Sequence, residues 1–239
     1  MSIYKTVIIV GPTAIGKSNL SILLAKKING EVIGLDSRQV FDFMPIGTGQ
    51  PNQKEMLGVK HHLIGTHKIL KNISAGQYSK LVRKSIKKIL QKKKIPIICG
   101  GSGLYFRALV NGLFKGSITN LEIRKRLSKR LDSEGPKVLL DELKLVDPIY
   151  SKIVHPNNIK RLLRALEIYY ITGIGPSEHF KKQEINKKND IFFKIYIKTD
   201  LQFLKSKINK RILEMIKNGW IEEVSEISSM DYKDTNQAM

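Results

Sequence analysis

The eight residues from Gly11 to Ser18 read Gly-Pro-Thr-Ala-Ile-Gly-Lys-Ser and match the pattern GxxxxGK[ST]. The apolar run Val7–Val10 precedes them, and the apolar segment Leu20–Ala25 follows. This order predicts a strand, a glycine-rich loop and a helix, in which successive backbone N–H groups of the loop converge on one anion. The chain is therefore expected to bind a di- or triphosphate group.

All eight loop residues are candidates for that phosphate site, namely Gly11, Pro12, Thr13, Ala14, Ile15, Gly16, Lys17 and Ser18. Lys17 adds a positive charge, and the Ser18 hydroxyl can hold Mg²⁺. The alternative is a glycine-rich turn without a ligand. The motif alone specifies neither the phosphate compound nor whether a phosphoryl group moves.

Strand and helix patterns alternate along the chain, which is typical of an α/β layer protein. The predicted strands are Tyr4–Val10, Glu31–Asp36, Pro96–Cys99 and Ile191–Lys198. Lysines at 84–94 indicate the solvated face of a helix, with Ile86, Ile89 and Leu90 pointing inward. We expect a parallel P-loop sheet flanked by helices.

Residues 120–188 differ, because apolar residues recur there at helical spacing without a convincing strand. This predicts an all-helical insertion at residues 117–189, within a core domain formed by 1–116 and 190–239. After the insertion a helix from Leu201 to about Asn218 is expected to end at Gly219.

Composition limits the environment and the partners. The net charge of +21 favours a polyanion such as nucleic acid, although 33 of the 42 basic residues are Lys, a bias that an AT-rich genome alone can produce. The single cysteine, Cys99, favours a reducing, cytoplasmic environment. Near the N-terminus the only apolar stretch is too short for a signal peptide or a membrane span, so no membrane partner is expected. His61, His62 and His67 lack metal-ligand spacing.

The residues that follow the predicted strands are the candidates for chemistry, because ligands of open α/β sheets bind at the carboxyl ends of the strands. Asp36 follows the second strand and is a candidate Mg²⁺ ligand, general base or N-cap. Ser102 lies in the Gly100–Gly103 segment after the Pro96–Cys99 strand, where ATPases with this loop usually have a carboxylate.

Several segments, in one order along nearly the whole chain, resemble the tRNA dimethylallyltransferases, the isopentenyl-tRNA transferase family. The matching segments are GPTAIGKS at 11–18, DSRQVF at 36–41, IGTGQP at 46–51, HHLIG at 61–65, GGSGLY at 100–105, DPIYSKIVHPNNIKRLLRALEIYYITG at 147–173 and RILEMIKNGWIEEV at 211–224.

The resemblance implies transfer of a dimethylallyl group from its diphosphate to N6 of the adenine just 3′ of the tRNA anticodon, position 37. The loop would then hold the diphosphate of the prenyl donor, with Lys17, Ser18 and Mg²⁺ stabilising the leaving group. Asp36 would be the general base and Ser102 would contact the adenine, which has to leave the stack. Arg211 would reach the diphosphate, or it is a helix-surface arginine.

By the same resemblance a further set of residues would contact the anticodon stem-loop of tRNA: Asp36, Ser37, Arg38, Gln39, Ser102, Arg124, Lys160, Arg161, Leu162, Leu163 and Arg164. The helical insertion would grip that stem-loop. Spacing alone would make the basic residues of this set a solvated surface. We expect the protein to act as a monomer.

The chain departs from the family at a few positions. Gly49 and Gln50 stand where Ala-Lys is usual, and Arg38 and Phe41 stand where Met and Tyr are usual. Family members usually continue through a further helical stretch, so the chain resembles a C-terminally truncated member. Two alternatives stay open, a small-molecule or nucleotide kinase that uses ATP, and an RNA-binding fragment without turnover.

Overall fold

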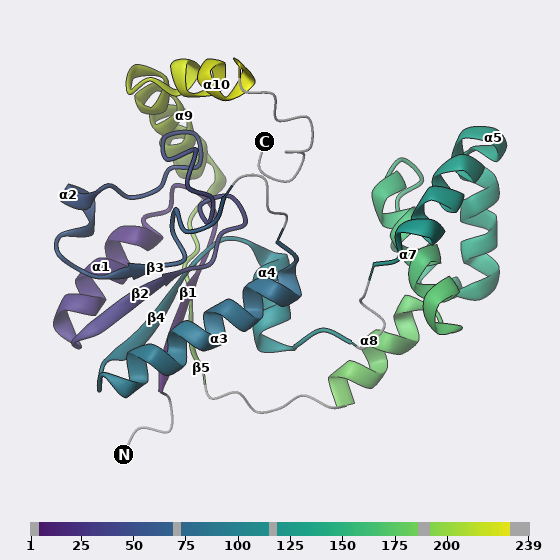
Figure 1. Cartoon of the computed structure of the whole chain (residues 1–239), viewed down its shortest axis with the longest axis horizontal. Helices are drawn as coiled ribbons and strands as arrows, with labels where there is room; N and C mark the ends of the chain where they lie inside the picture. The colour runs from purple at the N-terminus through teal and green to yellow at the C-terminus, as the bar shows by residue number, and fades with distance from the viewer. Residues whose placement is uncertain (1–4, 69–72, 115–118, 186–191, 230–239) are drawn as a thin grey trace. The chain divides into compact units, whose positions relative to one another are not determined.

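A computed structural model of the chain describes residues 5–68, 73–114, 119–185 and 192–229 (Figure 1). The chain forms two compact units. The first comprises Met1–Val110 and Asn189–Met239, and the second is Asn111–Lys188. Both predicted domain boundaries, 116/117 and 189/190, fall on segments outside the described residues.

The first unit contains a five-stranded sheet in the order β3-β2-β4-β1-β5, and all its pairings are parallel. Its strands are β1 Thr6–Val10, β2 Gly30–Gly34, β3 His61–His62, β4 Ile95–Gly100 and β5 Phe192–Tyr196. The predicted α/β class with a parallel sheet is confirmed. β3 was not predicted, because two residues are too few for a periodic signal.

The central strands are apolar on both faces, as a sheet covered on both sides requires. Ile8 packs with α3 Ala75–Gln91 and α4 Gly103–Val110, whereas Ile9 packs with α1 Lys17–Lys27. Figure 1 shows these helices around the sheet. At the edge, β5 is less covered, and its Tyr196 is 59% exposed.

The short helix α2 Gln53–Met56 follows a loop, and α9 Leu201–Lys217 and α10 Trp220–Ser229 follow β5. The predicted end of the helix at Gly219 is found, since Gly219 has a φ of 95° and separates α9 from α10. No residue of α9 is fully buried.

The phase of α3 differs from the prediction at one position. Ile89 is fully buried and Ile86 partly, but Leu90 is 36% exposed. The inward stripe of α3 is Tyr78, Val82, Ser85 and Ile89. The buried face of α3 therefore includes the small polar Ser85, whereas Leu90 lies at the edge of this face and is partly exposed.

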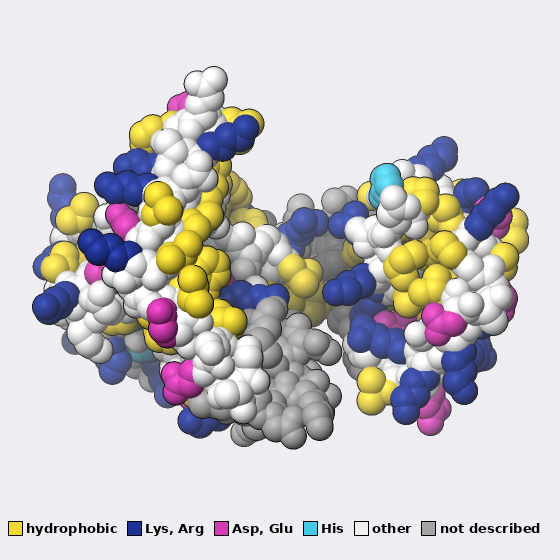
Figure 2. Space-filling view, turned by 90° about the horizontal axis from the view of Figure 1, so that it is seen from above, with side chains coloured by type: hydrophobic (Ala, Val, Ile, Leu, Met, Phe, Trp, Pro, Cys, Tyr) yellow, Lys and Arg dark blue, Asp and Glu magenta, His cyan; other side chains and the backbone are white. Residues whose placement is uncertain are grey.

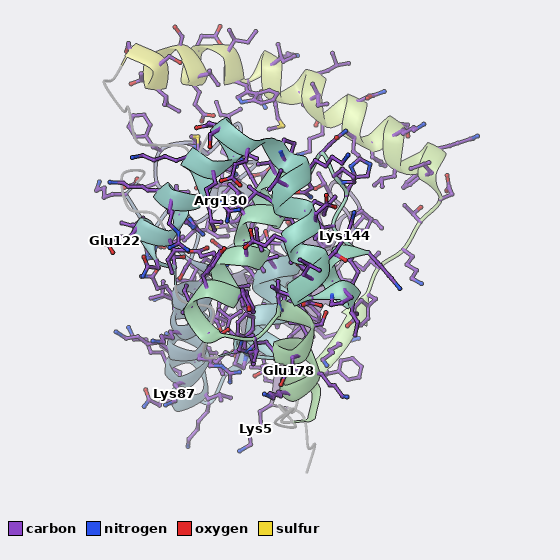
Figure 3. All side chains as sticks on the ribbon, turned by 90° about the vertical axis from the view of Figure 1, so that its right-hand side faces the viewer. Lys5, Lys87, Glu122, Arg130, Lys144 and Glu178 are labelled. Atoms are coloured by element: carbon purple, nitrogen blue, oxygen red, sulfur yellow. The ribbon has the colours of Figure 1, made fainter. Side chains whose placement is uncertain are left out.

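In the described residues of the second unit, all regular secondary structure is helical. Its helices are α5 Leu121–Val146, α6 Pro148–Ser151, α7 Ile159–Thr172 and α8 Pro176–Ile185. α5 breaks at Gly135, which has a φ of 81° and precedes Pro136. Arg130, labelled in Figure 3, pairs with Glu134 and, across the break, with Glu142 at 2.8 Å. Leucines of α5 and α7 form a separate core.

Among the described residues, none of the helices combines the length and the apolar character that crossing a bilayer demands.

Glu31, at the start of β2, is only 2% exposed and has one histidine and two lysines as neighbours. His62 Nε2 lies 2.7 Å from its carboxylate, and the Nζ atoms of Lys92 and Lys94 lie 3.2 and 3.1 Å away. Burial raises the pKa of the Glu31 carboxyl, but the hydrogen bonds from His62, Lys94 and Lys92 outweigh it and bring the pKa to about 2. The carboxylate therefore ties β3 and the α3–β4 turn to β2.

We expect Glu31→Gln to lower the free energy of unfolding by about 2 kcal/mol at pH 7. The folded pKa of Glu31 lies below 4.5, so this stabilisation is present above pH 4.5 and is lost as the pH falls toward 2. Urea unfolding, followed by the fluorescence of the single tryptophan, Trp220, measures the difference at both ends of this range. Glu226→Gln, on the exposed side of α10, is the control. Equal stability of Glu31→Gln and wild type at pH 7 would contradict the assignment.

Candidate active site

The phosphate loop connects β1 to α1 at the carboxyl edge of the sheet. Gly16 adopts a φ of 96°, and α1 begins at Lys17 without an acidic residue in its first turn. The positive end of the helix is therefore free to attract an anion. Gly11 is needed where the loop passes β5, since a side-chain Cβ there would lie 2.8 Å from the carbonyl oxygen of Ile197.

Lys17 lies among the groups from the other strand ends. Its Nζ donates to the carbonyl of Pro12 at 2.6 Å. Burial lowers the pKa of the Lys17 ammonium below its ordinary value; Cys99 and Asp36 oppose this shift, and the positive charge of Arg211 adds to it. Lys17, Asp36 and Arg211 therefore share one electrostatic environment.

Asp36 follows β2 and caps the turn that comes after it. Its Oδ1 accepts hydrogen bonds from the backbone N–H groups of Arg38 and Gln39, at 2.8 and 3.3 Å. A capping role for Asp36 was one of the alternatives, and it coexists with a chemical role, since Oδ2 has no hydrogen-bond partner among the described residues. The half-buried carboxylate is thus held by one oxygen and presents the other.

Ser102 fastens the end of β4 to the end of β2. Its Oγ accepts from the backbone N–H of Ser37 at 3.0 Å, and its own N–H donates to the carbonyl of Leu35 at 3.3 Å. The two backbones are so close that any side chain at Gly100 would overlap Leu35. Glycine at the end of β4 therefore allows the backbones of β4 and β2 to approach closely, which keeps Ser102 beside the Asp36 turn.

Two buried tyrosines lie beneath Asp36 and were not singled out from the sequence. The rings of Tyr78 and Tyr105 are 4.4 Å apart, and the Tyr78 hydroxyl donates to the carbonyl of Gly34. Burial, followed by the negative charge of Asp36, raises the pKa of both phenols. Both phenols therefore remain neutral, and their buried rings pack below the Asp36 carboxylate.

Arg211 lies on the inward side of α9, against the loop that precedes α2. A side chain at Gly49 would overlap its guanidinium. Gln39 reaches the same loop, and its Nε2 donates to the carbonyls of Thr48 and Gly49 at 3.1 and 2.7 Å. The Gln39 side chain is thus engaged within the protein, while Ser37 and Arg38 beside it are half-buried.

Ser18 is exposed, and among the described residues its hydroxyl has no hydrogen-bond partner. A serine hydroxyl is a hard oxygen donor of the kind that Mg²⁺ accepts beside substrate phosphates. The described residues contain no cluster of three or more His, Cys, Asp or Glu side chains that could hold a metal. The Ser18 hydroxyl is therefore a donor that would suit a magnesium ion bound together with a phosphate compound.

The three histidines named in the sequence analysis each have a partner within the protein. His61 Nδ1 lies 2.9 Å from the carbonyl of Val59, His62 pairs with Glu31, and His67 lies 3.0 Å from the Thr66 hydroxyl.

The basic residues predicted for RNA binding on α7 divide into two groups. Lys160 and Arg161 are exposed, whereas Arg164 is partly buried. Leu163 is half-buried, and the Leu162 side chain is fully buried in the helical core. Leu162 therefore presents no surface to a ligand in this structure, and its N–H donates to the carbonyl of Asn158.

Arg164 and Arg124 share the carboxylate of Glu167, which is fully buried. Arg164 lies 2.6 Å and Arg124 3.0 Å from Glu167 Oε2, and the N–H of Asn120 donates to Oε1 at 2.9 Å. Burial raises the pKa of Glu167, but these hydrogen bonds outweigh it and leave the pKa below its ordinary value. Glu167 was not singled out from the sequence, although a carboxylate between Leu166 and Ile168 on an apolar helix face was a usable signal.

Residues 39–239 match the model of the protein family described as IPP transferase. The chain is 38% identical over 229 residues to the tRNA dimethylallyltransferase of Alkaliphilus oremlandii, covering 95% of this chain and 73% of the relative. It is 41% identical over 223 residues to that of Fervidobacterium nodosum, covering 93% and 71%.

Two solved structures are also similar. A tRNA isopentenylpyrophosphate transferase from Bacillus halodurans has a TM-score of 0.64 and 34% identity, over 97% of this chain and 72% of that one. A eukaryotic dimethylallyltransferase acting on tRNA has a TM-score of 0.75 and 31% identity, over 99% and 58%.

We expect the affinity of the loop for inorganic diphosphate to fall as the pH rises, beginning below pH 10.5, because the pKa of Lys17 is lowered. The Lys17→Arg variant should bind diphosphate more weakly at neutral pH, since its geometry differs. Its guanidinium keeps its charge, so relative to wild type its affinity should not fall at alkaline pH. Calorimetric titration across this pH range measures the affinities of wild type and Lys17→Arg. The control is Lys87→Arg, which changes an exposed lysine of α3. An identical pH profile for wild type and Lys17→Arg would refute the role of Lys17.

Proposed function

The chain belongs to the IPP transferase family, and we propose that it transfers a dimethylallyl group from dimethylallyl diphosphate to N6 of the adenine 3′-adjacent to the tRNA anticodon, releasing diphosphate. The observation that carries this proposal is the convergence of Lys17, Asp36 and Arg211 at the phosphate loop. Two cationic side chains near a carboxylate with one unbonded oxygen suit a departing diphosphate and an incoming amine.

The first requirement is to stabilise the leaving group. The C–O bond between the allyl carbon and the diphosphate breaks, and the diphosphate leaves with the electron pair. Lys17, Arg211 and the N-terminus of α1 place positive charge where the negative charge develops. Mg²⁺, held by the Ser18 hydroxyl and the diphosphate oxygens, supplies further charge neutralisation when it is bound.

The second requirement is to align and deprotonate the amine. As the bond from N6 to the allyl carbon forms, N6 loses a proton, and Asp36 Oδ2 is placed to receive it. The hydrogen bonds to Oδ1 fix the carboxylate without occupying Oδ2. The Ser102 hydroxyl accepts from Ser37 N–H, so its own hydrogen is left to donate to the adenine base. Positioning matters because the adenine amine is a poor nucleophile.

The third requirement is to hold the anticodon stem-loop. Exposed Lys160 and Arg161 suit the RNA backbone, which they would contact through phosphate oxygens. Arg124, whose side chain is 50% exposed, keeps part of its guanidinium surface for RNA while it pairs with Glu167. Ser37 and Arg38 would contact RNA beside the extruded adenine. We propose a monomer that works in the cytoplasm.

Incubation of the chain with labelled dimethylallyl diphosphate, Mg²⁺ and unmodified tRNA tests the proposal directly. Label in the tRNA is expected, and it should disappear when the adenine after the anticodon is replaced. Bound but unlabelled tRNA would favour the fragment without turnover. ATP consumption with a small acceptor would favour the kinase, although β4 runs into Cys99-Gly100-Gly101 where a kinase of this type has a carboxylate.

We expect Asp36→Asn to reduce kcat by about 10²–10⁴-fold, because an amide cannot accept the proton. The affinities for donor and tRNA should remain within about twofold, since the Asn oxygen can still cap the Arg38 and Gln39 N–H groups. Single-turnover kinetics separates turnover from binding. Asp42→Asn, in the same segment but paired with Lys68, is the control. Normal turnover of Asp36→Asn would remove Asp36 as the base.

We expect replacement of both Lys160 and Arg161 by Gln to weaken tRNA binding and to reduce the slope of log K against log salt by about 1 to 2, because up to two phosphate contacts are lost. The control is Lys144→Gln, which removes an exposed lysine of α5 that is paired with Asp141. Filter binding at several salt concentrations measures the slopes. A slope equal to that of wild type would show that these two side chains do not contact phosphates.

A further inference from the structure

The loop between the Asp36 turn and α2 contains a hydrogen-bonded turn at residues 45–49. Within it, the N–H of Gly49 donates to the carbonyl of Ile46 and that of Gln50 to the carbonyl of Pro45, both at 2.8 Å. The N–H groups of Ile46 and Gly47 at its start, and the carbonyls of Thr48 and Gly49 at its end, have no partner inside the turn. Both ends of this turn therefore need partners from elsewhere.

Glu223 of α10 supplies the partner at the first end. Its Oε1 accepts from the N–H of Ile46 at 2.8 Å, and its Oε2 accepts from the N–H of Gly47 at 2.6 Å. Trp220, one turn earlier, lies so close that a side chain at Gly47 would overlap its indole. Hydrogen bonds to a carboxylate are stronger than those between neutral groups, so this contact fastens α10 to the turn.

The other end of the turn leads to the candidate active site. Gln39, three residues after Asp36, binds the carbonyls of Thr48 and Gly49. The Arg211 guanidinium packs on Gly49, where a side chain would displace it. The turn thus lies between the Asp36 segment and the helix that carries Arg211.

Packing alone holds this helix pair weakly. α9 has no fully buried residue, and in α10 only Ile227 is buried. Leu213 of α9 and Ile221 of α10 are 68% and 63% exposed. Figure 2, which looks down on these helices, shows hydrophobic side chains on their outer surface. With so little burial, the position of Arg211 depends on specific polar contacts.

We propose that Glu223 is a positioning residue for the donor diphosphate, because it fixes α10, and with it Arg211 of α9, against the turn at 45–49. This inference rests on the proposed role of Arg211 at the diphosphate. Glu223 itself does not touch the substrate. Its effect is to hold the guanidinium against Gly49, beside the segment that carries Asp36 and Gln39.

The test uses Glu223→Gln, which keeps the size of the side chain but has one acceptor oxygen where the carboxylate has two. We expect the Kd for inorganic diphosphate with Mg²⁺ to rise about tenfold and kcat/KM for dimethylallyl diphosphate to fall by at least that factor, with tRNA affinity near that of wild type. Placed on an Arg211→Ala background, Glu223→Gln should add no further loss. Gly47→Ala, which pushes the Trp220 indole away, should reproduce the effect of Glu223→Gln.

The matched control is Glu226→Gln, one turn along α10. Glu226 lines the same hollow beside the turn as Glu223, but among the described residues it accepts no hydrogen bond from the turn. Unchanged diphosphate affinity in Glu223→Gln and Gly47→Ala, or a loss that multiplies with that of Arg211→Ala, would overturn the proposal. A wild-type chain that binds no diphosphate would instead refute the proposed function on which it rests.

Discussion

The parallel pairing of β2, β4 and β1 is the constraint on which the candidate site depends. Its register sets Gly34 opposite Cys99 and Val10 opposite Gly100, so three loops leave the sheet at one edge. The contact between Gly100 and Leu35 shows how little space separates these loops. A cation from the first loop, a carboxylate from the second and a hydroxyl from the third become neighbours as a result.

Features that depend on near neighbours in the chain were predictable from the sequence. The phosphate loop, the strands on which the candidate site lies and the helical character of the insertion follow from local periodicity and composition. Asp36 and Ser102 were found by their places at the ends of strands. The phase of α3 was not predictable from the lysine-rich part alone, because the buried stripe is set by Tyr78 and Val82, which precede it.

The distant partners of three glutamates were beyond prediction, because they lie far along the chain from the glutamates that they contact. Glu31 meets lysines 61 and 63 residues away, Glu167 meets Arg124 at a separation of 43, and Glu223 meets the turn at 46–47 across more than 170 residues. Local propensity carries no information about such pairs. In a chain with twice as many basic as acidic residues, each carboxylate is a scarce counter-charge, and these three hold separate parts of the fold together.

The pairing of Arg124 and Arg164 with one carboxylate shows why a structural and an RNA-binding role are compatible. Two guanidinium groups facing one buried Glu167 leave an excess of one positive charge, and the Arg124 side chain remains half exposed. The ion pairs restrict the arginine rotamers before any ligand arrives, which reduces the entropy that binding would otherwise cost. A phosphate that approaches this pair meets donors that are already ordered. Under the proposed function, the carboxylate that stabilises the helical unit also prepares its surface for RNA.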